Sequence, residues 1–161
     1  MTDKPAAPGA ALGDEAFMTA EDLKAYMAEV ERARAAKDFA VMDRAEKARA
    51  ELEKTLREPI DLTPEKLREI VAGLQSKMRL AAERGETEIM VMRFPNSLCT
   101  DRGRAVNYAE EGWPDTLTGR PRQAYELWRD HLKPSHYRLK AMVIEWPHGM
   151  PGDIGFFLSW A

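Results

Sequence analysis

Residues 19–57 contain neither glycine nor proline, and the first proline after them is Pro59. Thr19 has the side chain of a helix N-cap, and the acids that follow it favour the positive end of a helix dipole. At 100° per residue, the apolar residues of this segment fall on one stripe. The residues of this stripe are Leu23, Met27, Val30, Val41, Ala45, Ala48, Leu52 and Leu56. The pattern therefore predicts one amphipathic helix, roughly 55 Å long at 1.5 Å per residue.

Two side chains near the middle of this segment allow a second interpretation. Phe39 and Met42 lie off the stripe, and they would fit a helical hairpin that turns at Lys37-Asp38. The stripe keeps its phase across Arg34 and Lys37, so we favour one helix. A stripe of this length has to be buried against the rest of the chain or against a second copy. Because Arg34 and Lys37 would lie on the seam, a tight coiled coil along the whole helix is disfavoured.

The segments on either side of this helical arm have the composition of flexible chain. Residues 1–18 are rich in Ala, Pro and Gly and hold few bulky apolar side chains. Such a segment buries too little surface to offset the entropy of ordering, which predicts a disordered tail. We therefore expect a disordered tail at 1–18, the helical arm at 19–58, a linker at 59–62 and an α+β domain at 63–161.

Composition places the chain among ordinary globular proteins. Of its 161 residues, 44% are hydrophobic and 32% are charged, which is a normal mixture with a rather charged surface. The formal net charge of −3 gives no global field that would attract nucleic acid or anionic lipid. A single cysteine cannot form an internal disulfide, and we see neither a secretory signal nor an apolar run of membrane-spanning length. These features predict a cytoplasmic protein without a membrane partner.

Residues 63–161 alternate between helical and strand patterns. Thr63, Pro64 and Glu65 together start a helix, which stops at Gly85. The other expected elements are a strand over 87–94, helices over 100–110 and 121–132, and strands over 137–146 and 153–160. The last two strands should form an antiparallel hairpin, whereas the two-helix crossover before them permits a parallel pair. The order α-β-α-α-β-β predicts an α+β fold with a small mixed three-stranded sheet, packed with helices mainly on one face.

Alternation within the strands predicts which side chains share a face of the sheet. In the strand over 87–94, Ile89 and Val91 are expected on one face, and Met90, Met92 and Phe94 on the other. Both faces of this strand would then be covered. In the closing strand, the residues expected on one side are Ile154, Phe156, Leu158 and Trp160.

The stretch FPNSLCTDRGRAVN, which follows the first strand, holds the side chains most suited to chemistry. Cys99 precedes a predicted helix whose N-terminus could lower the pKa of the thiol, and His131, His136 or His148 could approach it as a base. A lone cysteine beside Leu98 is more often a small buried apolar residue, and we favour that interpretation. His131 is expected on the apolar face of its helix. Neither a metal site nor a cofactor is expected, because these residues lack the spacing of metal ligands.

The same turn could also bind an anion. The first N–H groups of a helix have no partners within the helix, and Arg102 and Arg104 could donate to a phosphate or a carboxylate. Asp101, with Ser97 or Thr100 as the cap, would satisfy this helix without any ligand. A wider surface for anions or nucleic acid would use Arg93, Arg102, Arg104, Arg120 and Arg122. Because acids lie close to these arginines in the sequence, solvated ion pairs are the more common outcome.

The turn PHGMPG between the last two strands presents His148, which is a second catalytic candidate after Cys99. Glu145 and Asp153 flank this turn and could approach each other across the hairpin. We favour a turn whose prolines and glycines only reverse the chain, because carboxylates suited to acid and base catalysis do not cluster in the sequence.

These patterns lead to one preferred hypothesis about function and two alternatives. We expect a small bacterial protein of the cytosol, not an enzyme, that binds a protein partner or a second copy of itself through residues 19–58. The first alternative is nucleic-acid or anionic-ligand binding through the arginines of residues 93–122. The second alternative is an enzyme that uses Cys99.

Overall fold

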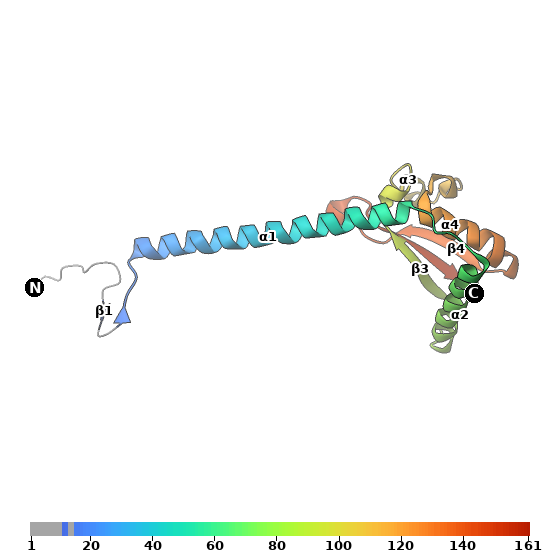
Figure 1. The fold of residues 1–161 in the computed structure, drawn as a ribbon, viewed down its shortest axis with the longest axis horizontal. Coiled ribbons are helices and arrows are strands. Elements are labelled where there is room, and N and C mark those ends of the chain that lie inside the picture. The colour runs from blue at the N-terminus through green and yellow to red at the C-terminus, as the bar shows by residue number, and fades with distance from the viewer. Residues whose placement is uncertain (1–10, 13–14) are drawn as a thin grey trace, which may run out of the picture. The chain divides into compact units, whose positions relative to one another are not determined.

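A short pair of strands and one long helix begin the described part of the chain. The computed structural model describes residues 11–12 and 15–161. Strand β1 (Ala11–Leu12) pairs antiparallel with β2 (Glu15–Ala16), and helix α1 (Ala20–Arg57) follows (Figure 1). The disorder expected for residues 1–18 concerns mainly residues that lie outside this description, so it remains a prediction.

Helix α1 is a single helix, as the unbroken pattern predicts. The Oγ1 atom of Thr19 accepts a hydrogen bond from the backbone N–H of Asp22 at 3.0 Å, and the Asp22 carboxylate accepts one from the N–H of Thr19 at 3.4 Å. This reciprocal pair satisfies donors at the start of the helix that have no intrahelical partner. The alternative of a hairpin at Lys37-Asp38 is wrong, because α1 continues through both residues.

The described chain divides into two units between Arg49 and Ala50, and a three-stranded sheet lies in the second unit. Its main elements are α2 (Pro64–Glu83), β3 (Glu88–Phe94), α3 (Arg104–Asn107), α4 (Gly119–Leu127), β4 (Arg138–Val143) and β5 (Ile154–Ser159). Single turns of 3-10 helix occupy Asn96–Leu98, Trp113–Thr116, Lys133–Ser135 and Pro147–Gly149, and a π-helical turn occupies Trp128–Leu132. The α+β class predicted from the sequence is confirmed.

The sheet has the order β3-β5-β4, and both of its pairings are antiparallel. The hairpin of β4 and β5 is as predicted, but the mixed sheet is wrong. Strands β3 and β4 do run in the same direction, which is the outcome expected for a crossover through helices. They do not pair with each other because β5 lies between them and bonds to both, which is the split β-α-β arrangement.

A β-bulge in β3 changes which of its side chains share a face. The register shifts between Met90 and Met92, so that Ile89 lies opposite Leu158 and Met92 lies opposite Phe156. Paired residues point to the same side of a sheet, and a bulge inserts one extra residue into that alternation. The grouping of Met90 with Met92 is therefore wrong, because Met90 points to the outer face and Met92 to the inner face.

The core of the second unit lies on the inner face of the sheet. Phe94 and Phe156 meet edge to face, with ring centroids 5.0 Å apart. Leu56, near the end of α1, belongs to the same cluster as these two rings. The other buried members are Leu98, Cys99, Val106, Leu117 and Ile154. The apolar face predicted for β5 is thus the centre of the core.

Two of the predicted helices differ from those observed. A helix was expected over 100–110, but the observed α3 spans only Arg104–Asn107. It cannot begin earlier because Arg102 and Gly103 both adopt left-handed backbone conformations, with φ of 58° and 85°. The helix expected over 121–132 begins earlier, at Gly119, and is α-helical only to Leu127. The π-helical turn that follows has more residues per turn than an α-helix and shifts the phase of the side chains after it. His131 is consequently exposed, and its predicted place on the apolar face is wrong.

Candidate functional site

The loop from β3 to α3 buries its cysteine. Cys99 is only 3% exposed and forms an antiparallel bridge with Leu117, in which the N–H of Thr100 donates to the carbonyl of Thr116 at 2.8 Å. On the other side of the bridge, the N–H of Thr118 donates to the carbonyl of Leu98 at 3.0 Å. The thiol is therefore held in the core by backbone pairing on both sides.

The environment of Cys99 is the opposite of what a nucleophile requires. Burial raises the pKa of its thiol from 9.0 to about 11, a hydrogen bond with Thr116 lowers this pKa in part, and the negative charge of Asp101 raises it further. A reactive cysteine needs the thiolate at neutral pH. His131, His136 and His148 are all exposed, and no group of three His, Cys, Asp or Glu in the described residues could hold a metal ion. The geometry thus gives catalysis by Cys99 no support.

The raised pKa of Cys99 predicts a specific loss of stability at alkaline pH. The folded chain holds the thiol proton more tightly than the unfolded chain, so this contribution is complete below pH 9 and is lost as the pH rises towards 11. Between pH 8 and pH 11, the free energy of unfolding of the wild type should fall by about 2 kcal/mol more than that of Cys99→Ala. Urea denaturation of both proteins across this pH range measures the difference. Parallel pH profiles would contradict the prediction.

The turn that precedes α3 is capped by its own carboxylate. The Oδ1 atom of Asp101 accepts a hydrogen bond from the N–H of Gly103 at 3.0 Å, and Oδ2 accepts one from the N–H of Ala105 at 2.8 Å. The N-cap position of α3 is Gly103, and the carboxylate that satisfies the N–H groups here belongs to Asp101. The prediction of Ser97 or Thr100 as the cap is wrong. An anion at this position would have to compete with a carboxylate that already holds both N–H groups. The exposed Arg102 and Arg104 thus flank an occupied turn.

Arg93 in β3 is bonded to the segments that follow β4 and precede β5. Its Nε atom donates to Asp153 and its terminal nitrogen donates to Glu145, both at 2.9 Å. The hydrogen bond and the charge of Asp153 raise the pKa of Arg93, with a smaller contribution from Glu145. Glu145 and Asp153 do approach across the hairpin, as the sequence allowed, but they hold a structural cation between them.

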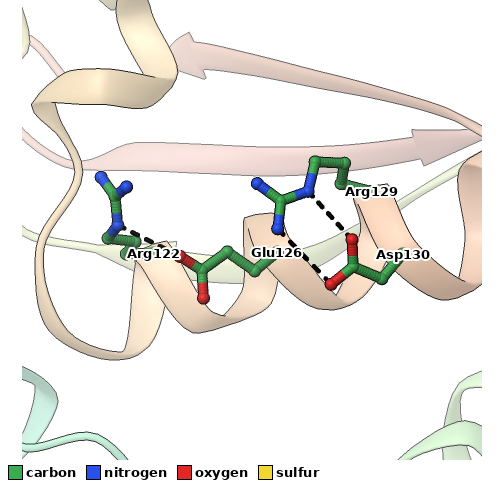
Figure 2. A network of polar contacts seen from close by, with 4 residues as sticks. All are labelled: Arg122, Glu126, Arg129 and Asp130. Carbon is green, nitrogen blue, oxygen red and sulfur yellow. Dashed lines mark hydrogen bonds and ion pairs between the residues drawn. The ribbon is translucent and has the colours of Figure 1, made fainter.

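Two of the other four arginines proposed for anion or nucleic-acid binding, Arg120 and Arg122, have partners within the chain. Arg120 donates from Nε to the carbonyl of Glu58 at 3.0 Å. Figure 2 shows Arg122 bound to Glu126 and Arg129 bound to Asp130 along α4 and the turn after it. The hydrogen bond from Arg129 lowers the pKa of Asp130. Nucleic-acid binding through this surface stays a prediction, and the local pairing of charges weakens its field.

The hairpin tip presents His148 to solvent. His148 lies in the turn Pro147–Gly149 with a left-handed backbone, at a φ of 52°, and Met150 after it is 66% exposed. The side chain of His148 makes no hydrogen bond or ion pair with any other described residue. An exposed imidazole without a partner has no group to orient it as a base. The hairpin tip therefore remains a turn in our interpretation.

The apolar stripe of α1 is exposed throughout residues 20–49. The exposed fractions are 49% for Leu23, 58% for Met27, 37% for Val30 and 52% for Val41. Large apolar side chains at helical spacing usually lie against another surface, and most of the stability of a helix in a protein comes from the packing of its amphipathic face. The sequence pattern identified this surface directly, because helical periodicity is a local property.

A cleft between α2, α4 and the inner face of the sheet was not predicted from the sequence. Its volume is about 410 Å³, and most of the side chains that line it are apolar. Gly73 and Leu74 come from α2, Leu127 from α4 and Phe156 from β5. No local pattern could have revealed it, because the lining residues are distant in the sequence and are brought together only by the fold.

Comparison with known proteins identifies no relative of this chain. No protein-family model matches it, and no match is found among curated proteins or solved structures. Among the helices of the described part, none combines the length and the hydropathy needed to cross a membrane. The proposals below therefore depend on the geometry of the chain itself.

Proposed function

We propose that the chain is a non-enzymatic protein that self-associates through residues 20–49 of α1. The observation that supports this proposal most strongly is the exposed stripe formed by Leu23, Met27, Val30 and Val41. Burial of apolar surface is the main favourable term in association, and a fully buried side chain of this size contributes about 1.5–3 kcal/mol. A second helix laid along the stripe would supply this burial.

The distribution of side-chain sizes along the stripe favours a second copy in antiparallel orientation. The N-terminal half of the arm carries the large side chains of Leu23, Tyr26 and Met27, and the C-terminal half carries Ala45 and Ala48. An antiparallel pair centred between residues 35 and 36 places Leu23 opposite Ala48 and Tyr26 opposite Ala45. Large and small residues at facing positions interdigitate well between packed helices. A parallel pair in register would instead face alanine with alanine.

The polar centre of the stripe is compatible with this arrangement. In the antiparallel pair, Arg34 of one helix lies opposite Lys37 of the other, and Asp38 lies beside that lysine. An arginine can bond to a carboxylate with its planar guanidinium while its methylenes cover apolar surface. Asp38 therefore offers Arg34 a partner across the interface, which lowers the cost of burying the charge.

Thermal unfolding followed by circular dichroism tests the proposal. If the arm is helical because it is paired, the helical signal should melt at a temperature that rises with protein concentration, because association stabilises the folded form by mass action. The measurement compares melting curves at micromolar and near-millimolar concentrations of the full chain. A midpoint that does not change with concentration would contradict self-association through the arm.

A further inference from the structure

The cleft of about 410 Å³ in the second unit has the size and chemistry of a small-ligand site. Its floor is the inner face of the sheet, where Met92, Phe156 and Leu158 line it, and α2 and α4 form its sides. Ligand pockets typically measure about 300–1,000 Å³ and combine an apolar lining with a few polar groups. The cleft lies outside the arm that carries the proposed self-association.

Three charged side chains line the cleft, and two of them already have partners. Arg120 donates to the carbonyl of Glu58 at 3.0 Å, and Glu69 lies 3.9 Å from the ammonium group of Lys66. Lys77 lines the cleft as well, and its side chain makes no ion pair or hydrogen bond with another residue of the described chain. Two cations and one acid therefore give the lining a net positive charge. Of these two cations, Lys77 is the one whose side chain has no partner within the described part of the chain.

The volume of the cleft distinguishes between classes of occupant. Two turns of α-helix, about 10 Å across and about 11 Å long, fill roughly 850 Å³, which is about twice the space available. At roughly 30 Å³ for each water-sized group, the cleft holds on the order of ten methylene groups. A single acyl chain fits within this space, whereas two turns of a partner helix would extend well beyond it.

We propose that the cleft binds an anionic amphiphile of the fatty-acid class. The acyl chain lies on the inner face of the sheet between α2 and α4, and the carboxylate is held by the ammonium group of Lys77. A charge-assisted contact of this kind distinguishes a carboxylate from a neutral head group on the same tail. The apolar lining supplies affinity, and Lys77 supplies the preference for an anion.

Gly73 offers a way to block the cleft without damage to the fold. Gly73 lines the cleft in the middle of α2, and a Cβ atom built on it meets nothing within 4 Å. Ile70 and Lys77, three and four residues away on the same face of α2, also line the cleft, so Gly73→Leu is expected to place its side chain there. It also replaces glycine with a better helix former. Ala72→Leu is the matched control, because Ala72 is its exposed neighbour in α2 and does not line the cleft.

Isothermal titration of the full chain with decanoate, below its micelle concentration, and with decanol tests the proposal. We expect saturable one-to-one binding of decanoate by the wild type and by Ala72→Leu, and loss of binding in Gly73→Leu. Lys77→Gln should weaken decanoate binding about tenfold and leave decanol binding unchanged. Absence of saturable binding in the wild type, or undiminished binding in Gly73→Leu, would overturn the site. Equal decanoate binding by the wild type and Lys77→Gln would overturn the role of the carboxylate.

Discussion

With Val30→Glu and Val41→Glu combined, the full chain is expected to be a monomer at every concentration. In the antiparallel pair these two positions face each other, so each dimer loses four valine contacts and gains four acids at its interface. The valine contacts alone, at roughly 1.5 kcal/mol each, correspond to about 6 kcal/mol, or about four powers of ten in the dissociation constant. Burial of the new carboxylates without partners would add to this cost. Sedimentation velocity measures the effect.

The matched control places the same charges on the opposite side of α1. Ala25 and Ala36 are exposed, are eleven residues apart like Val30 and Val41, and lie on the far side of the helix at 100° per residue. Ala25→Glu and Ala36→Glu combined should leave the association of the chain within about threefold of the wild type. If both double variants weaken association equally, the added charge is the cause and the stripe is not the interface.

Gly119→Ala is expected to lower the free energy of unfolding of the second unit by at least about 3 kcal/mol. Gly119 adopts a φ of +59°, and a Cβ atom built there would lie 2.2 Å from the carbonyl oxygen of Leu56 and 2.8 Å from the Cα of Arg57. These are backbone atoms that cannot rotate away. The adjoining segment is also fixed, because Ile60 and Gln123 exchange two hydrogen bonds of 2.9 and 2.7 Å. The contact can be relieved only if the end of α1 moves away from α4.

Urea denaturation followed by tryptophan fluorescence measures this loss. All four tryptophans lie between residues 113 and 160, so the signal reports on the second unit. Gly112→Ala is the control, because Gly112 has a φ of −80° and a Cβ atom there meets nothing within 4 Å. It should change the free energy of unfolding by less than about 0.5 kcal/mol. Equal stabilities of the two variants would show that the close approach at Gly119 is unimportant.

Features that depend on near neighbours in the chain could be predicted from the sequence. The caps and the apolar periodicity of α1 and α2 were sufficient to place both helices, and the alternation around Phe156 identified a buried strand. The hairpin of β4 and β5 followed from the turn residues between them. In each case the signal lies within a few residues of the structure that it specifies.

Features that depend on distant partners could not be predicted in the same way. Strands β3 and β5 pair across the two-helix crossover, although they are distant in the sequence. Nothing in the residues of either strand specifies the other as its partner. Arg93 was a candidate for anion binding because no partner for it is visible in the nearby sequence. The two acids that bind it, Glu145 and Asp153, lie 52 and 60 positions away. The left-handed backbone at Arg102 shortened α3, although arginine seldom adopts that conformation. These outcomes arise from tertiary packing, which overrides local preference.

The candidate sites also differ in whether they depend on near neighbours in the chain or on distant ones. The stripe of α1 was predicted because its residues recur at helical spacing. The buried thiol of Cys99 was the favoured interpretation, but its raised pKa depends mainly on burial in the folded unit. The cleft above the sheet had no signal at all in the sequence, because Gly73, Leu127 and Phe156 become neighbours only in the folded chain.

Sedimentation equilibrium of the unmodified full chain, from micromolar to near-millimolar concentration, tests the central claim most directly. Self-association through the arm predicts a mass that rises with concentration to twice the 18.3 kDa of one chain. A mass of 18.3 kDa throughout this range would contradict it.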